Sequence, residues 1–386
     1  MKRIILLLSL LGAASAQTLQ VIHNFKPYST DGWQSWASLV FDSSGDLYGT
    51  TRLGGAHDPK GCEKVSCGTV FKLSLNAKGV WVRTIVHSFG GPGDVGIWPE
   101  TGVTLDAAGN IYGTTLFGGP EGGGTGFELS PKPKGGWTVT ILRGFSSIDR
   151  SYSGLILDQA GNLYGTTSST VFELSSGSGG WTNTVLYQFS GEPHITAGLV
   201  LDTAGNLYGT TSEGGTCGCG TVFEVSPGAN NQWTETTVYN FKGGSDGSAP
   251  IGGLTLDSEG NLYGTTSVGY PGGGTIFELS LGSSGWTKTI LYSFKRGVGD
   301  GDGPRGALVF DAVGNLYGTT GEGGTYNYGT VFEMSSEGIE TILRSFNVKD
   351  GEGPAAGLVL DSGGNLYGTT VGGGLYNGGN VFKLKP

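Results

Sequence analysis

The side chains best suited to binding a ligand recur at one position of a repeated sequence. The segment Asp-x-x-Gly-Asn-Leu-Tyr-Gly-Thr-Thr occurs seven times with little change. Six positions before its aspartate stand Trp36, Glu100, Tyr152, Thr196, Ile251, Arg305 and Ala355. Packing alone does not require such a mixture. Aromatic rings beside carboxylate and guanidinium groups suit the faces and hydroxyl edges of a sugar, and equally a peptide loop.

Neighbouring residues concentrate this chemistry in the first four units. Those units add Trp33, Trp98, Arg150 and His194, whereas units five to seven offer mainly Pro250, Pro304 and Pro354 with small neighbours. The residues expected to bind ligand are therefore Trp33, Trp36, Trp98, Glu100, Arg150, Tyr152, His194 and Arg305. The alternative is that Trp36 and Trp98 only fill a central channel.

Aromatic and amide residues in the loops between the second and third strands of the units extend this candidate surface. They are Phe117, Tyr270, Tyr326, Asn327, Tyr328, Tyr376 and Asn377. Loops of variable length and chemistry on a regular scaffold commonly carry binding sites. The alternative is that these aromatic side chains only cover the tops of the repeats.

Metal and cofactor chemistry finds little support. Asp300 and Asp302 stand two residues apart, and Asp350 and Glu352 repeat the arrangement one unit later, so these oxygens are weak candidates for Ca²⁺. Neither pair completes an EF-hand loop. We favour solvated acidic turns and expect no cofactor.

Two common enzyme motifs are absent from the sequence. There is no His-Glu-x-x-His and no phosphate loop ending in Gly-Lys-Ser/Thr. The enzymatic alternative is a lyase or lactonase with a channel-bound metal, in which Glu100 is a base or ligand and His194 a general acid. A binding or scaffold protein without catalytic activity is the favoured interpretation. A structural surface protein with no small ligand is a further alternative.

Internal repetition predicts the architecture that positions these residues. The repeat aspartates are 44 to 64 residues apart, at Asp42, Asp106, Asp158, Asp202, Asp257, Asp311 and Asp361. That is the length of a four-stranded propeller blade. Each unit contains four strand-like runs, which in the fifth unit are residues 253–257, 261–266, 275–280 and 286–294. Asp, Gly and Asn between the first two runs are typical of a tight turn.

The ends of the chain predict how the ring closes. The last unit stops after its third strand at 381–386, and the missing fourth strand resembles residues 19–25. We therefore predict an all-β, seven-bladed β-propeller over 17–386, with residues 17–30 completing the last blade and removing both sheet edges. The repeats begin near 35, 99, 151, 195, 250, 304 and 354. A parallel solenoid is the rival fold, but it does not explain the matched ends.

The recurring sequence motifs also resemble those of a known family. The sequences at 199–211, 220–225 and 291–294 resemble the Gloeo-Verruco (GloVer) tandem repeat, and the similarity covers 18–386. The resemblance implies an exported bacterial repeat protein, often with a C-terminal anchor and without an established activity. This chain ends at Pro386 without such an anchor.

Composition and cysteine use indicate an exported chain. Of the 386 residues, 76 are glycine, and the net charge is −10 without a basic run, so nucleic acid is not an expected partner. Residues 1–16 have the charged start, apolar run and small-residue site of a secretory signal. No segment is long and apolar enough to span a bilayer.

Both cysteine pairs precede a Gly-Thr-Val-Phe segment. We predict disulfide bonds from Cys62 to Cys67 and, as a tighter ring, from Cys217 to Cys219. The chain is expected to be a secreted or periplasmic monomer whose partner is an extracellular glycan or protein.

Overall fold

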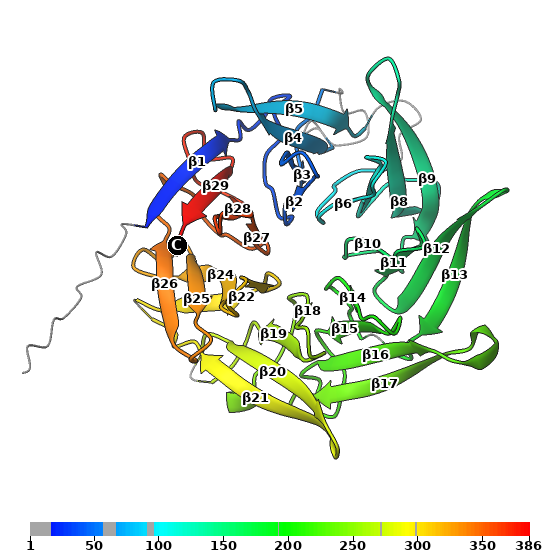
Figure 1. The fold of residues 1–386 in the computed structure, drawn as a ribbon, viewed down its shortest axis with the longest axis vertical. Helices are drawn as coiled ribbons and strands as arrows, with labels where there is room; N and C mark the ends of the chain where they lie inside the picture. The colour runs from blue at the N-terminus through cyan, green and yellow to red at the C-terminus, as the bar shows by residue number, and fades with distance from the viewer. Residues whose placement is uncertain (1–16, 57–66, 91–95, 192, 271, 298) are drawn as a thin grey trace, which may run out of the picture.

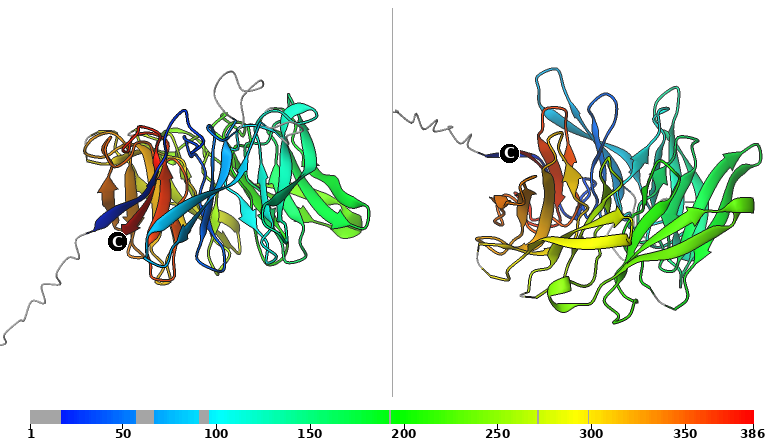
Figure 2. Two further views of the ribbon diagram at one scale, coloured as in Figure 1. Left: turned by 90° about the horizontal axis from the view of Figure 1, so that it is seen from above. Right: turned by 60° about the horizontal axis from the view of Figure 1, so that its bottom comes forward.

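The computed structural model describes residues 17–56, 67–90, 96–191, 193–270, 272–297 and 299–386. Seven antiparallel sheets surround a central axis and form a seven-bladed β-propeller, as predicted (Figure 1). The short innermost strand of each blade faces the axis, and the outermost strand lies at the periphery. Seen from the side, the ring is wider than it is deep (Figure 2).

The blades follow one another along the chain. Blade 1 contains β2 (Val40–Phe41), β3 (Leu47–Thr51), β4 (Thr69–Leu75) and β5 (Trp81–Ser88). Blade 2 contains β6 (Thr104–Leu105), β7 (Ile111–Thr114), β8 (Gly122–Pro131) and β9 (Trp137–Ser146). Blade 3 contains β10 (Ile156–Leu157), β11 (Leu163–Thr166), β12 (Thr170–Gly177) and β13 (Gly180–Gln188). Blade 4 contains β14 (Val200–Leu201), β15 (Leu207–Thr211), β16 (Thr221–Pro227) and β17 (Trp233–Asn240).

The remaining blades repeat this order. Blade 5 contains β18 (Thr255–Leu256), β19 (Leu262–Thr266), β20 (Thr275–Gly282) and β21 (Gly285–Ser293). Blade 6 contains β22 (Gly301–Pro304), β23 (Val309–Phe310), β24 (Leu316–Gly323), β25 (Thr330–Met334) and β26 (Glu340–Ser345). Blade 7 contains β27 (Val359–Leu360), β28 (Leu366–Thr370) and β29 (Asn380–Lys385). Short 3-10 turns occur at Ala229–Asn231 and Gly244–Asp246.

The N-terminal strand closes the ring. Strand β1 (Thr18–Asn24) pairs antiparallel with β29 and becomes the outermost strand of blade 7, as the matched ends predict (Figure 1). Phe25 follows β1 and is fully buried, 5.3 Å from the Phe71 ring of blade 1. The first and last blades are therefore joined by β-pairing and by aromatic packing.

The repeat aspartate is a structural residue of the turn between the first two strands of each blade. Asp202 Oδ1 accepts hydrogen bonds from the backbone N–H groups of Ala204 and Asn206, and its Oδ2 accepts one from the Tyr208 hydroxyl. The other six repeat aspartates accept the same three kinds of bond. These carboxylates hold the turns and are not free to bind ligand.

The Gly-Thr-Thr sequence joins one blade to the next. A Cβ atom on Gly209 would lie 2.5 Å from the Phe223 ring, so only glycine fits beneath that core side chain. In five blades the first threonine reaches the neighbouring blade. Thr369 Oγ1, for example, donates to the Ala37 carbonyl at 3.1 Å, which links blade 7 to blade 1. The second threonine pairs within its own blade, as Thr51 does with Thr69 at 2.8 Å.

Phenylalanine pairs form the core between blades. In each pair, a ring at the end of an outermost strand packs against a ring of the next blade's third strand, with centroids 4.9 to 5.7 Å apart. The apolar core is thus a series of seven interfaces around the axis.

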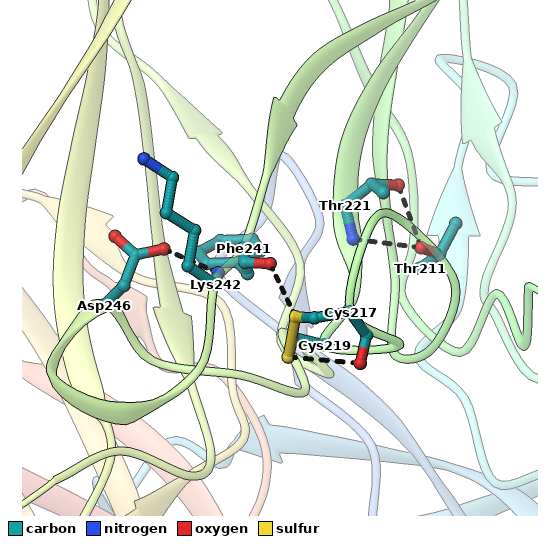
Figure 3. The surroundings of a disulfide bond; sticks show 7 residues. All are labelled: Thr211, Cys217, Cys219, Thr221, Phe241, Lys242 and Asp246. Carbon is teal, nitrogen blue, oxygen red and sulfur yellow. Dashed lines mark hydrogen bonds between the residues drawn. A yellow bond between two sulfur atoms is a disulfide. The ribbon is translucent and has the colours of Figure 1, made fainter.

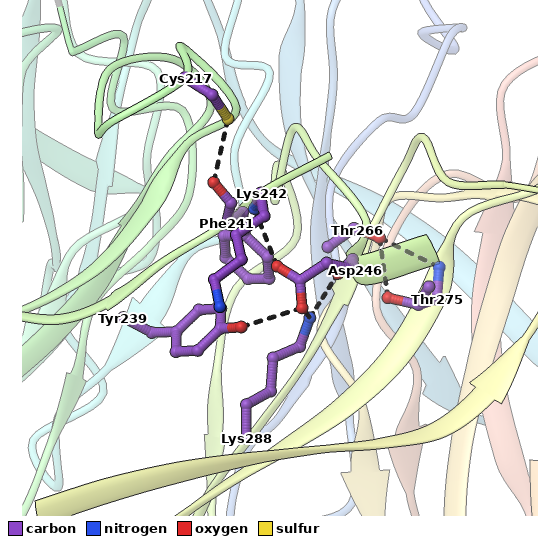
Figure 4. Close-up of polar contacts among 8 residues, drawn as sticks. All are labelled: Cys217, Tyr239, Phe241, Lys242, Asp246, Thr266, Thr275 and Lys288. Atoms are coloured by element: carbon purple, nitrogen blue, oxygen red, sulfur yellow. Dashed lines mark hydrogen bonds and ion pairs between the residues drawn. The ribbon is translucent and has the colours of Figure 1, made fainter. Parts of the chain in front are cut away.

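Charged side chains supplement some of these interfaces. Between blades 4 and 5 the Lys288 ammonium lies 3.0 Å from Asp246 Oδ1 and 4.6 Å from the centre of the Phe241 ring (Figure 4). The Tyr239 hydroxyl donates to the same carboxylate at 2.9 Å. Burial lowers the pKa of Lys288, and hydrogen bonds from its partners lower the pKa of Asp246 although burial opposes them.

Two details differ from the predicted strands. The innermost strand of the fifth blade was predicted over 253–257 but is only Thr255–Leu256. These two residues alone pair with the adjacent strand β19. The acidic segment at 300–302 was expected to be an open turn, but Gly301–Pro304 forms strand β22 and pairs with β24. Glu352 and Gly372 form the corresponding single bridge in blade 7.

Candidate functional site

One face of the ring combines the variable loops with the crossovers between blades. We call it the loop face; it contains the loops between second and third strands, such as 212–220, and the crossovers, such as 241–254. The two kinds of segment touch in several blades, as the Trp33–Leu53 and Ile97–Phe117 bridges show. Side chains from the loops and from the crossovers can therefore contact the same ligand.

A repeated backbone position fixes side chains on this face. We call the residue eight positions before each repeat aspartate the rim position: Gln34, Trp98, Arg150, His194, Ala249, Gly303 and Gly353. All of them except Arg150 have positive φ, between 49° and 63°. Non-glycine residues seldom adopt this conformation, which is often found at functional sites.

Main-chain hydrogen bonds hold the rim position. The Ala249 N–H donates to the Cys219 carbonyl of the preceding blade at 3.0 Å, and its own carbonyl accepts from the Ser267 N–H. Gln34, Trp98 and Gly353 make the same two kinds of bond. The backbone therefore presents the side chain without using it for support.

The largest cavity described lies over blades 6, 7 and 1. We call it the blade 6–7–1 cavity; it has a volume of about 740 Å³. Its polar and aromatic lining residues are Trp33, Gln34, Trp36, Arg305, Glu322, Asn327, Tyr328, Glu352 and Asn377. Gly353 occupies the rim position of blade 7 and leaves space that a side chain would fill.

This cavity has unused hydrogen-bonding capacity. Trp36 Nε1 is buried and has no hydrogen-bond partner in the protein. Glu322 and Glu352 supply acceptors, and the exposed Arg305 supplies donors. Indole rings beside such groups can stack on a planar or sugar-like face while the polar atoms bind its edges.

The central channel brings together the positions six residues before the repeat aspartates. All seven, from Trp36 to Ala355, line a cavity of about 400 Å³ along the axis. Trp36 and Arg305 also line the blade 6–7–1 cavity, so the two spaces adjoin.

Glu100 is the only carboxylate among these seven channel residues. Burial raises its pKa, and the Arg52 guanidinium opposes that rise from 2.9 Å. Arg52 in turn lies 4.6 Å from the Trp98 ring centre. Trp98 packs edge-on against Phe117 and lines neither cavity.

A third cavity lies on the loop face at blades 3 and 4. We call it the blade 3 cavity; it measures about 410 Å³ and its lining includes Arg150, Tyr152 and His194. Tyr152 also lines the channel. The eight residues predicted to bind ligand are therefore distributed: Trp33, Trp36 and Arg305 in the first cavity, Arg150, Tyr152 and His194 in the third, Glu100 in the channel, and Trp98 in none of these.

Sequence reasoning missed part of the blade 6–7–1 cavity. Gln34 and Glu322 were not considered, and Glu352 was considered only as a weak calcium ligand. The repeat contained a usable signal, because Gln34 occupies the same rim position as the predicted residues Trp98, Arg150 and His194. The predicted loop residues Asn327, Tyr328 and Asn377 do line this cavity.

The candidate calcium ligands have protein partners. Asp300 accepts hydrogen bonds from Lys295 N–H and the Tyr292 hydroxyl. Asp302 pairs with Arg296 at 3.1 Å, and Asp350 pairs with Arg344. Within the described ranges, no group of three or more His, Cys, Asp or Glu side chains is arranged to hold a metal ion.

The tighter of the predicted disulfide bonds is present. Cys217 and Cys219 are bridged in the loop of blade 4 (Figure 3). Cys217 Sγ contacts the Phe241 carbonyl oxygen at 3.1 Å, and the Cys219 carbonyl accepts the rim hydrogen bond from Ala249. Cys67 is buried and disulfide-bonded, while Cys62 lies outside the described residues.

Family comparison agrees with the repeated sequence. The model of the Gloeobacter/Verrucomicrobia repeat matches residues 13–196 and 168–382, and so covers nearly the whole chain. The chain belongs to the Gloeobacter/Verrucomicrobia repeat family. No curated protein matches this family member.

Solved structures similar to this Gloeobacter/Verrucomicrobia repeat protein share its fold. Virginiamycin B lyase from Staphylococcus aureus has a TM-score of 0.60 at 13% identity, with 96% of this chain and 99% of that chain covered. A putative 6-phosphogluconolactonase from Bacteroides uniformis has a TM-score of 0.52 at 13% identity, covering 79% and 83%. One from Bacteroides fragilis has a TM-score of 0.51 at 14% identity, covering 80% and 82%. These identities support a common propeller fold and nothing finer.

A search of the described part of this repeat protein found no helix with the length and apolar character needed to cross a bilayer.

Proposed function

We propose that this propeller is an exported, non-enzymatic binding protein that takes an extracellular glycan in the blade 6–7–1 cavity. The observation that carries the proposal is that two indole rings and two carboxylates line one cavity of about 740 Å³. They belong to Trp33, Trp36, Glu322 and Glu352. Indole rings match the apolar faces of a sugar, and carboxylates accept hydrogen bonds from its hydroxyl groups. The unpartnered Trp36 Nε1–H offers a further donor.

Export is part of the same proposal. The Cys217–Cys219 disulfide favours an oxidising compartment, because thiols are kept reduced in the cytosol. Residues 1–16 have the pattern of a secretory signal. A protein segment could use the same aromatic surface and is an alternative occupant.

The enzymatic alternative receives less support. Glu100 lines the channel and is paired with Arg52, whereas His194 lines the blade 3 cavity. An acid and a base acting on one substrate need to reach it from a shared space. We therefore do not build the proposal on this pair.

A glycan array probed with purified chain 17–386 tests the proposal. A Trp36→Ala, Glu352→Gln variant should lose the bound glycan by at least about tenfold in affinity, since each change removes a stacking or hydrogen-bonding contact. Tyr270→Ala is the matched control, because this aromatic side chain is 74% exposed and lies outside the cavity. Equal thermal melting of the three proteins shows that the variants fold.

Three results would oppose the proposal. Binding to no glycan, or binding that the Trp36→Ala, Glu352→Gln variant retains, would remove the sugar from this cavity. A protein partner whose binding depends on the same two residues would replace the glycan. A chain stabilised by no ligand would favour the purely structural role, because only a ligand that prefers the folded state raises the melting temperature.

A further inference from the structure

The blade 3 cavity differs in chemistry from the blade 6–7–1 cavity. It is bounded by the crossover into blade 3, the loop of blade 3 and the crossover into blade 4. Its lining residues with polar or ionisable side chains are Ser147, Arg150, Tyr152, Ser168, Ser169 and His194. Among the described residues, this lining contains no counterpart of the glutamates that line the blade 6–7–1 cavity.

Arg150 presents a cation that forms no ion pair with any described residue. Four other arginines pair with carboxylates: Arg52, Arg83, Arg296 and Arg344. No described carboxylate lies within ion-pair distance of Arg150, and its Nε is buried with no hydrogen-bond partner. Its guanidinium carbon lies 4.3 Å from the Phe117 ring centre, and this cation–π contact restrains the group. A restrained guanidinium with an unpartnered N–H is suited to a carboxylate.

The serine hydroxyls beside Arg150 are oriented as acceptors. Ser168 and Ser169 both donate to Asp149 Oδ1, at 3.1 and 3.0 Å. Ser169 Oγ also accepts from Gln188 Nε2 at 3.1 Å. The protons of both hydroxyls are therefore used, and the lone pairs of Ser168 Oγ are left for a donor on the ligand.

This polarity discriminates between anions. Phosphate and sulfate oxygens need several donors, and here the Ser168 and Ser169 protons are already given to Asp149. A ligand that combines one carboxylate for Arg150 with a hydroxyl donor for Ser168 fits better. The half-exposed Tyr152 ring, 40% accessible, can cover an apolar sugar face.

We propose that the blade 3 cavity is a second binding site, specific for a sugar acid whose carboxylate is held by Arg150 and whose hydroxyl group donates to Ser168. Tyr152 also lines the channel, which adjoins the blade 6–7–1 cavity through Trp36 and Arg305. An acidic glycan can therefore engage both sites. The inference rests on the proposed function only in assuming that a glycan is the ligand.

Isothermal titration of chain 17–386 with sodium D-glucuronate tests the site directly. Glucuronate should bind at least about tenfold more tightly than D-glucose, which lacks the carboxylate, and inorganic phosphate should bind more weakly still. Arg150→Gln should weaken glucuronate binding by about tenfold or more, and Ser168→Ala by a smaller factor. The control Arg296→Gln alters an exposed arginine that lines none of the three cavities, and it should bind as the parent does.

The outcomes separate this inference from the proposed function. Glucuronate binding that survives in Trp36→Ala, Glu352→Gln but is lost in Arg150→Gln supports the second site even if the larger cavity binds nothing. No binding of glucuronate, or equal binding by the parent and a folded Arg150→Gln, overturns it. Phosphate binding as tight as glucuronate binding overturns the assignment of a sugar acid.

Discussion

Arg52 Nε lies 2.9 Å from Glu100 Oε1 where the loop face meets the central channel. Burial raises the pKa of Glu100, and Arg52 supplies the compensating charge. The ion pair therefore offsets part of the cost of burying the Glu100 carboxylate beside the channel.

Removing the cation from this pair should destabilise the ring in a pH-dependent way. Without Arg52 the pKa of Glu100 rises further above its unfolded value, so stability is lost as the pH rises above about 4.5. We expect Arg52→Gln to lower the free energy of unfolding by about 1–3 kcal/mol at pH 7 and by less at pH 4. Urea denaturation at the two pH values measures this. The Arg52→Gln, Glu100→Gln double variant should recover part of the loss; a loss independent of pH would contradict the interpretation.

Deleting the N-terminal strand should open the ring. A chain that starts at Lys26 lacks β1 and Phe25, and so exposes the edge of β29 and removes a fully buried ring. We expect a clear fall in melting temperature and a tendency to associate through the exposed edge. Phe25→Ala is the matched control, with an expected cost of about 3–5 kcal/mol while β1 remains paired. Equal stability of the parent and the shortened chain would refute ring closure by this strand.

Glu340 should make stability fall between weakly acidic and neutral pH. Burial and the nearby Asp300 raise the pKa of Glu340 to about 7 from its ordinary value of 4.5. The folded state therefore holds the proton more tightly than the unfolded state, and stability declines as the pH rises from about 4.5 to about 7. In Glu340→Gln the free energy of unfolding should fall less over this pH range. The difference from the parent should be about 1–2 kcal/mol after allowance for partial solvent exposure. Urea midpoints at pH 5 and pH 8 give the comparison.

The exposed Glu337 supplies the control for that experiment. Glu337→Gln should keep the pH dependence of the parent. If Glu340→Gln and Glu337→Gln behave alike, the titration belongs to another group.

Breaking the Lys288–Asp246 pair should depend on which partner is removed. Asp246→Asn leaves a buried ammonium without its counter-ion, and we expect a cost of about 3–5 kcal/mol. Lys288→Met should cost less, because the Asp246 carboxylate keeps the Lys242 N–H and the Tyr239 hydroxyl as donors. Because the folded pKa of Asp246 is depressed, its contribution is present above about pH 4 and is lost on further acidification. Thermal melting of the two single variants ranks the costs; the reverse order would contradict this account.

The fold was predictable because the residues that hold each blade together are close in sequence and recur in every unit. The repeat aspartate, the glycine beneath the core phenylalanine and the paired threonines occupy fixed offsets, and the terminal strands resemble one missing unit. Strand β22 was not predictable, since Gly301–Pro304 contains no strand-forming side chain and pairs only because the extended β24 lies beside it.

The sites were predictable only in part. The rim residues Trp98, Arg150 and His194 were recognised by type, but the cavities depend on which blades meet and on where a side chain is missing. Gly353 leaves space over blade 7, so the blade 6–7–1 cavity extends from the first unit into the last two, where no ligand-binding residue other than Arg305 was predicted at the channel mouth. The unpartnered Nε–H of Arg150 was also not predictable, because it depends on which described side chains lie near it in space and not on its neighbours in sequence.

The backbone bonding of the rim position separates recognition from folding. Because both main-chain groups of Ala249 or Gln34 are satisfied by other main-chain groups, exchanging the side chain there alters no bond that holds the blades together. A chain built in this way can acquire a new binding specificity through substitutions in one blade at a time, while the backbone of the propeller stays the same. The same arrangement offers protein engineers several positions on the loop face where side chains can be exchanged.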